Sequence, residues 1–399
     1  MHNDFIVVGG GVIGISIARE LKRRYPDCGV SVLEKENSYA QHASGRNSGV
    51  LHAGFYYTAD SLKARFTRDG NRELTQFCEE HDIPINKCGK LVVTRNESEL
   101  DSLDELFARA QRNGVQVDAV TEDDAREIEP RAKTYERALY SPTTSSVNPL
   151  DVVKSMESEA RNEGIRFHYN EQYIGHDKKG GILTKTGAKY AGYLVNAGGL
   201  YADQIARGFG FSQGYSILPF KGIYLYSNEP PGSFRTNIYP VPDLRNPFLG
   251  VHFTVAADNK AKIGPTAIPA FWREQYNGYK NFKMGEFAEI LYRELGLFTS
   301  SNFGFMRLAY EEMRKQSRTQ MVKLAAELAR DIKVSDYTHW GKPGIRAQLL
   351  DTKNRKLEMD FVIEGDDRSM HVLNAVSPAF TCSLPFSRYV CDMIENELN

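Results

Sequence analysis

The sequence predicts an α/β fold with two domains, one of which is assembled from separate segments of the chain. Three observations support this prediction. A strand, a glycine-rich turn and a helix follow one another over residues 5–24, short strands rich in aromatic and β-branched residues fill 217–263, and strand-like segments return after residue 344. A chain of 399 residues is also long enough to bury two cores.

Residues 5–24 predict the first unit of a dinucleotide-binding fold. An apolar strand is followed by Gly9, Gly11 and Gly14, in the spacing G-x-G-x-x-G, and then by an amphipathic helix. In this arrangement the glycines permit a tight turn and a close approach of the backbone to a pyrophosphate, which the helix N-terminus attracts. Glu34 closes a second apolar strand about twenty residues after Gly14, where this fold places a carboxylate for an adenosine ribose. We therefore expect a Rossmann-like domain.

Two further stretches of small residues indicate where the backbone comes close to a ligand. Residues 37–57 show no clear helical or strand period, and so long an irregular segment inside a compact domain is usually functional. Its many small residues suit a backbone that passes a flat or charged group. Residues 196–199, with the sequence NAGG, form a similar turn between a strand and a helix.

Local patterns predict the remaining elements. Asn148 and Pro149 suit the N-cap and the first position of a helix, and Gly114 suits the end of another. We expect strands over 30–33, 90–95, 165–170 and 344–350, helices over 61–81, 97–113, 121–128, 145–162 and 380–397, and mostly helical structure over 282–332.

The order of these elements predicts the domain boundaries. Patterns typical of the nucleotide domain return after about residue 145 and again near the end of the chain, so that domain is discontinuous. We expect it to comprise 1–80, 145–215 and 340–399. A second, mixed antiparallel-sheet domain, inserted as an α+β segment, comprises 81–144 and 216–339 and contributes the substrate side of the site.

Composition excludes several classes of function. The net charge of −1 gives no global field for nucleic acid. The five cysteines show no spacing typical of a metal site, so we expect no metal and a reducing compartment. Residues 1–4 are too few for a signal peptide ahead of the first strand, and no stretch of eighteen apolar residues occurs. We expect a cytoplasmic protein and leave open a peripheral contact at the inner face of the membrane.

The order of motifs resembles the FAD-dependent oxidoreductases of the D-amino-acid-oxidase-like superfamily. A narrower match is carried by six blocks: Ser44–Tyr57, Pro219–Tyr224, Gly250–Thr254, Ile263–Tyr276, Gly344–Leu349 and Asn374–Leu384. Through these blocks the chain is similar to the L-2-hydroxyglutarate dehydrogenase (oxidase) family. Four positions depart from the residues that the family more often has, which are Arg where Lys221 stands, Glu for Ile223, Asn for Thr266 and Pro for Val376. A lysine in place of arginine loses bidentate carboxylate geometry.

The resemblance implies FAD as the cofactor and makes the discontinuous domain its binding domain. The residues expected to contact it come from the glycine motif, the second strand end, the small-residue loop, the NAGG turn and the start of the last helix. They are Gly9, Gly11, Val12, Ile13, Gly14, Glu34, Lys35, Ser44, Gly45, Asn47, Ser48, Gly49, Val50, Ala197, Gly198, Ser377, Pro378, Ala379, Phe380 and Thr381.

The resemblance also implies a reaction. A 2-hydroxy acid, most directly L-2-hydroxyglutarate, loses a hydride to FAD and becomes 2-oxoglutarate. Because no second nucleotide motif is present, the electrons are expected to pass to a quinone or to oxygen. Two alternatives stay open: an oxidase of amino acids or secondary amines from the same superfamily, and a partner protein that binds FAD without catalysis.

Five residues are candidates for this chemistry. Arg346 lies in an otherwise apolar strand, where a charge is costly unless it is paired, and suits a substrate carboxylate. His52 and His252 are rival bases for the hydroxyl proton, because imidazole titrates near neutrality. Lys221 and Tyr239 suit the distal end of a dicarboxylate. The sequence does not decide between the two histidines.

Overall fold

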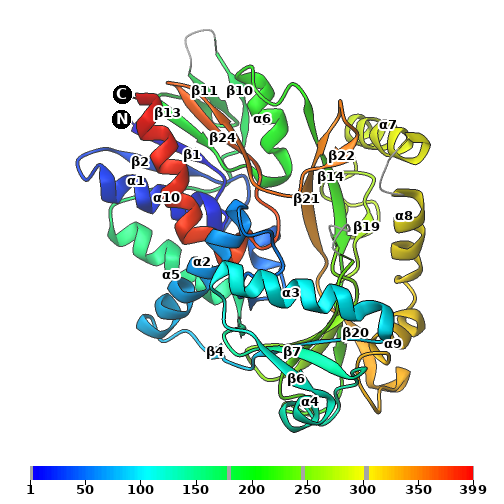
Figure 1. Cartoon of the computed structure of the whole chain (residues 1–399). Coiled ribbons are helices and arrows are strands. Elements are labelled where there is room, and N and C mark those ends of the chain that lie inside the picture. The colour runs from blue at the N-terminus through cyan, green and yellow to red at the C-terminus, as the bar shows by residue number, and fades with distance from the viewer. Residues whose placement is uncertain (1–2, 178–180, 244–247, 301–304, 399) are drawn as a thin grey trace. The chain divides into compact units, whose positions relative to one another are not determined.

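The computed structural model describes residues 3–177, 181–243, 248–300 and 305–398, and the chain divides into two compact units (Figure 1). Unit 1 comprises Met1–Asn47, Pro149–Pro219 and Arg346–Asn399, and unit 2 comprises Ser48–Asn148 and Phe220–Ile345. We expected residues 48–80 in the nucleotide domain, but they cluster with unit 2. The reason is a long-range pairing within unit 2, because β3 (Val50–Leu51) pairs with β8 (Ser145–Val147).

Unit 1 is built on a six-stranded sheet in the order β23-β24-β13-β1-β2-β9. All neighbouring strands in it are parallel except β23 and β24. Because β1 lies between β13 and β2, the carboxyl ends of these three strands meet at one edge, where open parallel sheets bind ligands. The strands are β1 (Asn3–Val8), β2 (Val30–Leu33), β9 (Arg166–His168), β13 (Ala191–Asn196), β23 (Val362–Gly365) and β24 (Ser369–Asn374).

Two helices from opposite ends of the chain pack together in unit 1. Helix α1 (Val12–Arg24) lies beside α10 (Ala379–Leu398), blue and red in Figure 1. Arg24 joins them, since its guanidinium bonds Glu20 at 2.7 Å and Asp392 at 2.7 Å. Unit 1 also contains α5 (Pro149–Asn162), α6 (Ala202–Gly208) and the small sheet of β10 (Tyr173–His176), β11 (Ile182–Thr184) and β12 (Gly187–Lys189).

Unit 2 is built on an eight-stranded sheet in the order β20-β15-β18-β17-β16-β5-β7-β6. The described pairs are antiparallel except β16 with β5, which are parallel. The strands are β5 (Lys90–Val93), β6 (Asp118–Thr121), β7 (Arg137–Ser141), β15 (Leu225–Ser227), β16 (Asn237–Pro240), β17 (His252–Val255), β18 (Ala261–Gly264) and β20 (Tyr337–Trp340).

Each face of this sheet supports a separate core. Leu91, Ile238 and Phe253 point to one face and pack with α9 (Arg318–Ala325). Val92 and Tyr239 point to the other and pack with α3 (Leu100–Asn113) and residues 53–56. The remaining elements of unit 2 are α2 (Leu62–Glu80), α4 (Glu122–Ile128), α7 (Met284–Ser300), α8 (Phe305–Arg314) and β4 (Ile85–Asn86).

Two strands carry the chain between the units. β14 (Tyr215–Gly222) pairs with β19 (Ile268–Pro269), and β21 (Gly344–Asp351) pairs with β22 (Lys356–Leu357). Two predicted elements need correction. In the segment 145–162, the helix begins at Pro149, as the Asn148–Pro149 pattern predicts, but residues 145–147 ahead of it form the unpredicted strand β8. The segment 37–57 is less irregular than expected, since it contains a 3-10 turn at Ala43–Gly45 and β3.

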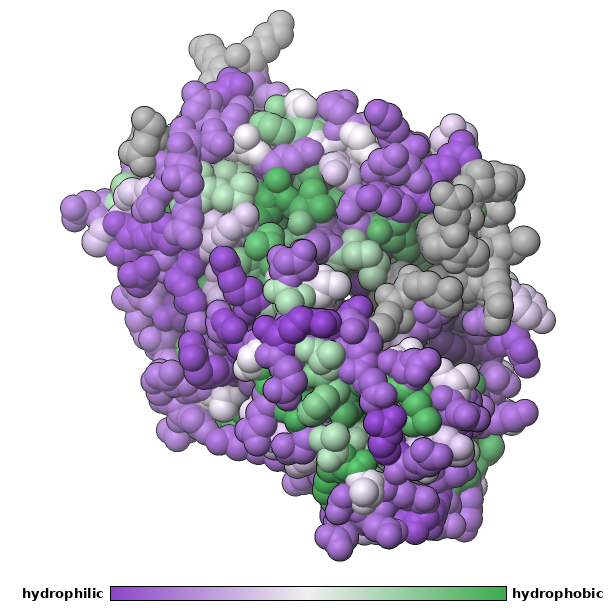
Figure 2. All heavy atoms as spheres, in the orientation of Figure 1, coloured by the Kyte–Doolittle hydropathy of each residue, from purple (hydrophilic) through white to green (hydrophobic). Residues whose placement is uncertain are grey.

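The structure confirms the predicted mixed α/β class. Hydrophilic side chains cover most of the face drawn in Figure 2. Among the described residues, no helix has both the length and the apolar character needed to cross a membrane.

Candidate functional site

The turn after β1 leaves no room for side chains. The Gly9 amide donates to the Leu33 carbonyl at 2.8 Å, and the Ala197 amide donates to the Val8 carbonyl at 2.9 Å, so three strand ends are held together. A Cβ on Gly9 would lie 2.3 Å from the Ala197 oxygen, and one on Gly14 would lie 1.9 Å from the Gly9 oxygen. Only glycine fits at these two positions, because the helix, the turn and the strands pack too closely to leave room for a Cβ atom.

The N-terminus of α1 is suited to an anion. Gly11 precedes the helix in an extended conformation, and the first turn contains no acidic side chain. The Ser44 hydroxyl accepts from the Val12 amide at 2.9 Å, which brings the small-residue loop to the helix start. The partial positive charge of this helix end is therefore available to a phosphate. Val12 and Ile13, both predicted contacts, form the first positions of the helix.

Glu34 is held rigidly at the end of β2. Its carboxylate accepts from the Gly10 amide at 2.8 Å and from the Glu36 amide at 2.9 Å. A buried carboxylate with fixed oxygens suits recognition of ribose hydroxyls.

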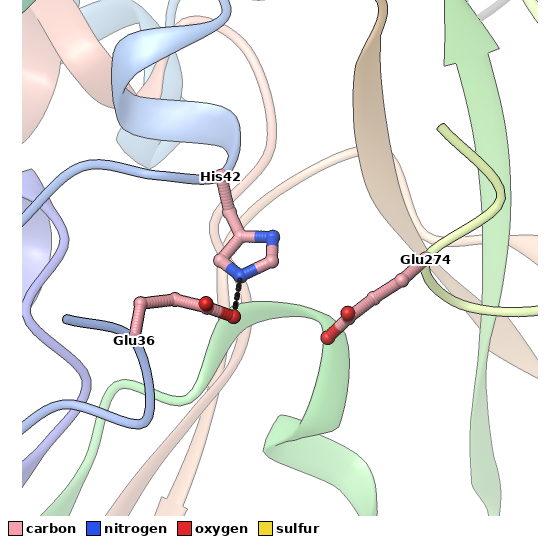
Figure 3. Close-up of side chains that lie close together, drawn as sticks. All are labelled: Glu36, His42 and Glu274. Atoms are coloured by element: carbon pink, nitrogen blue, oxygen red, sulfur yellow. Dashed lines mark hydrogen bonds and ion pairs between the residues drawn. The ribbon is translucent and has the colours of Figure 1, made fainter. Parts of the chain in front are cut away.

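Sequence reasoning missed a small charged group beside Glu34. The His42 ring bonds the Glu36 carboxylate at 2.9 Å (Figure 3). Lys35 pairs with the same carboxylate. The hydrogen bond from His42, together with Lys35, lowers the pKa of Glu36 to about 2. Lys35, a predicted cofactor contact, is thus anchored by its neighbour.

The other predicted cofactor residues divide between the units. In unit 1, Asn47 donates to the Ser44 carbonyl at 2.9 Å, and a Cβ on Gly45 would lie 2.2 Å from a backbone oxygen. Gly198 donates its amide to Asn196 Oδ1 at 3.0 Å in the turn that also holds Ala197. Ala379, Phe380 and Thr381 open α10, and Ser377 and Pro378 precede it. Ser48, Gly49 and Val50 belong to unit 2.

Strand alternation gathers polar side chains on one face of the unit 2 sheet. Tyr239 follows Ile238, and His252 precedes Phe253, so both point away from the core under Ile238 and Phe253. Lys262 lies opposite Thr254 on the same side. The predicted residues Tyr239 and His252 are therefore neighbours.

His252 has a fixed ring orientation. Its imidazole stacks on the Tyr239 ring with centroids 3.8 Å apart, and Nδ1 donates to the Gly250 carbonyl at 3.0 Å. Because a carbonyl can only accept, Nδ1 carries the hydrogen and Nε2 keeps a lone pair. Burial lowers the pKa of His252 to about 3, so the ring is neutral at ordinary pH.

His52 belongs to the same environment. It follows β3 and is buried, and burial lowers its pKa to about 3, with further lowering by Lys90 and His252. The structure thus brings the rival imidazoles close enough for His252 to affect the protonation of His52.

Lys90 was missed by sequence reasoning. It opens β5 and is fully buried, with its ammonium 4.5 Å, 4.4 Å and 5.1 Å from the ring centroids of Phe55, Tyr56 and Tyr239. Burial lowers its pKa to about 7. The available signal was a lysine in a short apolar strand, the same signal that singled out Arg346.

Lys262 provides a second buried amine. Its Nζ donates to the Ser48 carbonyl at 3.0 Å and lies 4.7 Å from the Tyr224 ring centroid, and burial lowers its pKa to about 8.

The two remaining candidates lie elsewhere. Lys221 is on β14 in unit 2, where burial lowers its pKa, and no hydrogen bond or ring contact among the described residues joins its side chain to the histidines. Arg346 belongs to unit 1, and its Nε donates to Gln348 Oε1 at 3.0 Å, which fixes the guanidinium plane.

The neutral imidazoles predict a pH-dependent stability. Both folded pKa values lie near 3, below the ordinary value of about 6.5, so between these limits the unfolded chain binds more protons. The free energy of unfolding therefore rises with pH in this window and falls on acidification, by about 2 kcal/mol per imidazole between about pH 6.5 and 4.5. Urea unfolding at both pH values measures this loss of free energy. The loss in H252Q should be smaller than in wild type by the contribution of one imidazole, and an equal loss in the two proteins would contradict the prediction.

Comparison with known proteins agrees with this geometry. A family model described as FAD dependent oxidoreductase matches residues 4–393. The chain is 34% identical to L-2-hydroxyglutarate dehydrogenase of Escherichia coli strain K12, over 99% of this chain and 94% of that protein. Among solved structures, it resembles FAD-bound L-alpha-glycerophosphate oxidase of Mycoplasma pneumoniae, with a TM-score of 0.77, 19% identity and coverage of 99% and 95%. It also resembles glycine oxidase of Geobacillus kaustophilus, with a TM-score of 0.73, 18% identity and the same coverage.

Proposed function

This chain belongs to the FAD-dependent oxidoreductase family, and from that premise we propose that it oxidises L-2-hydroxyglutarate to 2-oxoglutarate. The relatives that match over nearly the whole length support the choice of substrate. The observation that carries the proposal is the fixed ring of His252, which stacks on Tyr239 and donates Nδ1–H to the Gly250 carbonyl, so that Nε2 keeps a lone pair that can accept a hydroxyl proton.

The cofactor side of the proposal uses unit 1. The glycine turn at Gly9 and Gly14, the uncapped start of α1 and the fixed Glu34 carboxylate suit the pyrophosphate and the adenosine ribose of FAD. When bound, FAD supplies a two-electron acceptor for the hydride. The start of α10 would hold the flavin end.

The proton side uses unit 2, and we assign the role of base to His252. The available lone pair of this ring is on Nε2, because Nδ1 carries the hydrogen that is donated to the Gly250 carbonyl. Nε2 takes the hydroxyl proton, and Tyr239 keeps the ring plane fixed by stacking. His52 then serves as a positioning residue in the same buried environment.

Two basic candidates are assigned to bind the carboxylates of the substrate. Arg346, oriented by Gln348, would bind the carboxylate next to the reacting carbon, because a planar guanidinium matches a carboxylate. Lys221 would bind the distal carboxylate with a single charge. The electrons would pass on to oxygen or to a quinone.

An anaerobic reduction assay tests the proposal. L-2-hydroxyglutarate added to the oxidised holoenzyme should bleach the flavin absorbance and yield one equivalent of 2-oxoglutarate. The D enantiomer, glycine, sarcosine and D-amino acids are the matched comparisons. Bleaching by an amine and not by the hydroxy acid would replace the proposal with an amine oxidase. Bleaching by none of these compounds would favour a non-catalytic FAD-binding protein.

A second assay identifies the electron acceptor. It compares the release of hydrogen peroxide in air with the reduction of a soluble quinone.

A further inference from the structure

Lys90 is a buried amine that has no counter-ion among the described residues. Its side chain is fully buried, and Nζ has no hydrogen-bond partner among the residues that the structure describes. The faces of Phe55, Tyr56 and Tyr239 attract the ammonium, but ring faces only partly replace the water that a charged group loses on burial. Buried charges in proteins are normally paired, so this one points to a ligand of opposite charge.

The groups that face Lys90 do not supply that charge. The segment after β3 contributes His52 and Tyr56, β16 contributes Tyr239, and β17 contributes His252. All four are neutral when the imidazoles are unprotonated. In the described part of the chain, no carboxylate acts on Lys90.

Groups further along the sheet add positive charge. Lys262 on β18 and Lys315, which follows α8, both act on His252, and the Asp258 carboxylate acts on Lys262. Lys315 is paired with Glu312. The face is therefore electropositive around the imidazole pair.

Unpartnered hydroxyls lie in the same cluster. Tyr56 OH is buried without a hydrogen-bond partner among the described residues, and the Tyr239 and Thr254 hydroxyls lie near each other without a hydrogen bond of normal geometry. Tyr56 and Tyr239 are two of the three rings around Lys90, and Thr254 shares the sheet face of His252. Buried polar atoms are nearly always bonded, so a set of orphaned donors beside a cation again indicates a missing acceptor.

We propose that Lys90 makes this face of unit 2 an anion receptor. Its ammonium attracts a carboxylate of a ligand that binds beside His52 and His252, and this carboxylate balances the buried positive charge. Lys90 acts as a positioning residue, because its Nζ is enclosed by the three rings and attracts the anion through the low-dielectric interior. The identification of that anion as a dicarboxylate substrate rests on the proposed function.

The test measures binding rather than turnover. Isothermal titration of the holoenzyme with glutarate, a dicarboxylate without an oxidisable hydroxyl, is carried out at about pH 6 and about pH 7.5, on either side of the pKa of Lys90 of about 7. Glutarate should bind wild type about three- to fourfold more tightly at the lower pH, because a pKa of about 7 leaves roughly nine-tenths of Lys90 protonated at pH 6 and about a quarter at pH 7.5. K90R keeps its charge and should bind tightly at both values, whereas K90M should bind weakly at both.

Three controls keep the result interpretable. Glutaramide, which is uncharged, should not respond to the Lys90 variants. K87M removes an exposed lysine three positions away and should behave as wild type. The melting temperature and the flavin spectrum report whether each variant is folded.

Two outcomes would overturn the inference: K90M that binds glutarate as tightly as wild type at the lower pH, or a folded K90R that binds as weakly as K90M. If K90M does not fold, the comparison of K90R with wild type decides the question. An equal change in glutarate affinity between the two pH values in both proteins would reject the role of Lys90. Failure of every hydroxy acid to bleach the flavin would reject the proposed function and leave this titration intact.

Discussion

Replacing Gly14 with valine is expected to yield a colourless protein. A Cβ at this position would lie 1.9 Å from the Gly9 carbonyl oxygen and 3.4 Å from the Ala197 Cβ, so the helix start must move away from both strand ends. The displaced α1 N-terminus no longer meets a pyrophosphate, and FAD affinity should fall by more than about 100-fold. Overpacking should also lower the free energy of unfolding by about 1–3 kcal/mol. The visible spectrum of the purified protein and a fluorescence titration with FAD measure the first effect, and urea unfolding the second.

Gly214→Ala is the matched control in the same unit. A Cβ there meets nothing within 4 Å, so G214A should retain its flavin and its stability. A G14V protein that purifies yellow with wild-type affinity would show that the turn does not bind the cofactor.

Replacing His252 with glutamine should remove the proton acceptor while keeping the fold. A glutamine amide can still donate to the Gly250 carbonyl, but it cannot take up a proton. Loss of a general base typically costs 10²–10⁴-fold, so the rate of anaerobic flavin bleaching by L-2-hydroxyglutarate should fall by about that factor. H52Q should cost less than about tenfold, since His52 is assigned a positioning role. Stopped-flow absorbance gives both rates.

H339Q, on an exposed position of β20, is the control for a histidine outside the cluster and should leave the rate unchanged. A larger loss in H52Q than in H252Q would exchange the two assignments. The flavin spectrum of each variant distinguishes lost chemistry from lost cofactor.

The sequence predicted elements closely where their signals are local. The strand at 30–33 has the same bounds in the structure, and Gly114 ends its helix in the left-handed conformation with φ of 64°. Short strands were harder. β8 was missed, because it has only three residues and its pairing partner β3 lies about 95 positions earlier in the chain. Assignment of 48–80 to the nucleotide domain failed for the same reason: residue order does not reveal that β3 pairs with β8.

The site was only partly readable for a related reason. His52, His252 and Tyr239 were singled out one at a time, and the structure brings them into one cluster through strand alternation and a loop that follows β3. Lys90 was overlooked, because a lysine at a strand end is usually exposed and only the tertiary fold buries this one under three rings. The roles assigned to Lys221 and Arg346 remain predictions.

The pairing of β13 with β24, and of α1 with α10, has a consequence for biosynthesis. During synthesis β1 and β2 emerge first. One neighbour of β13 is β24, which comprises residues 369–374, and α1 packs against α10, which comprises residues 379–398. The nucleotide-binding half therefore cannot complete its sheet until almost the whole chain has left the ribosome, and the nascent α1 must stay soluble in the meantime. Three basic residues in its last turn, Lys22, Arg23 and Arg24, help to keep it so before Asp392 arrives as a partner.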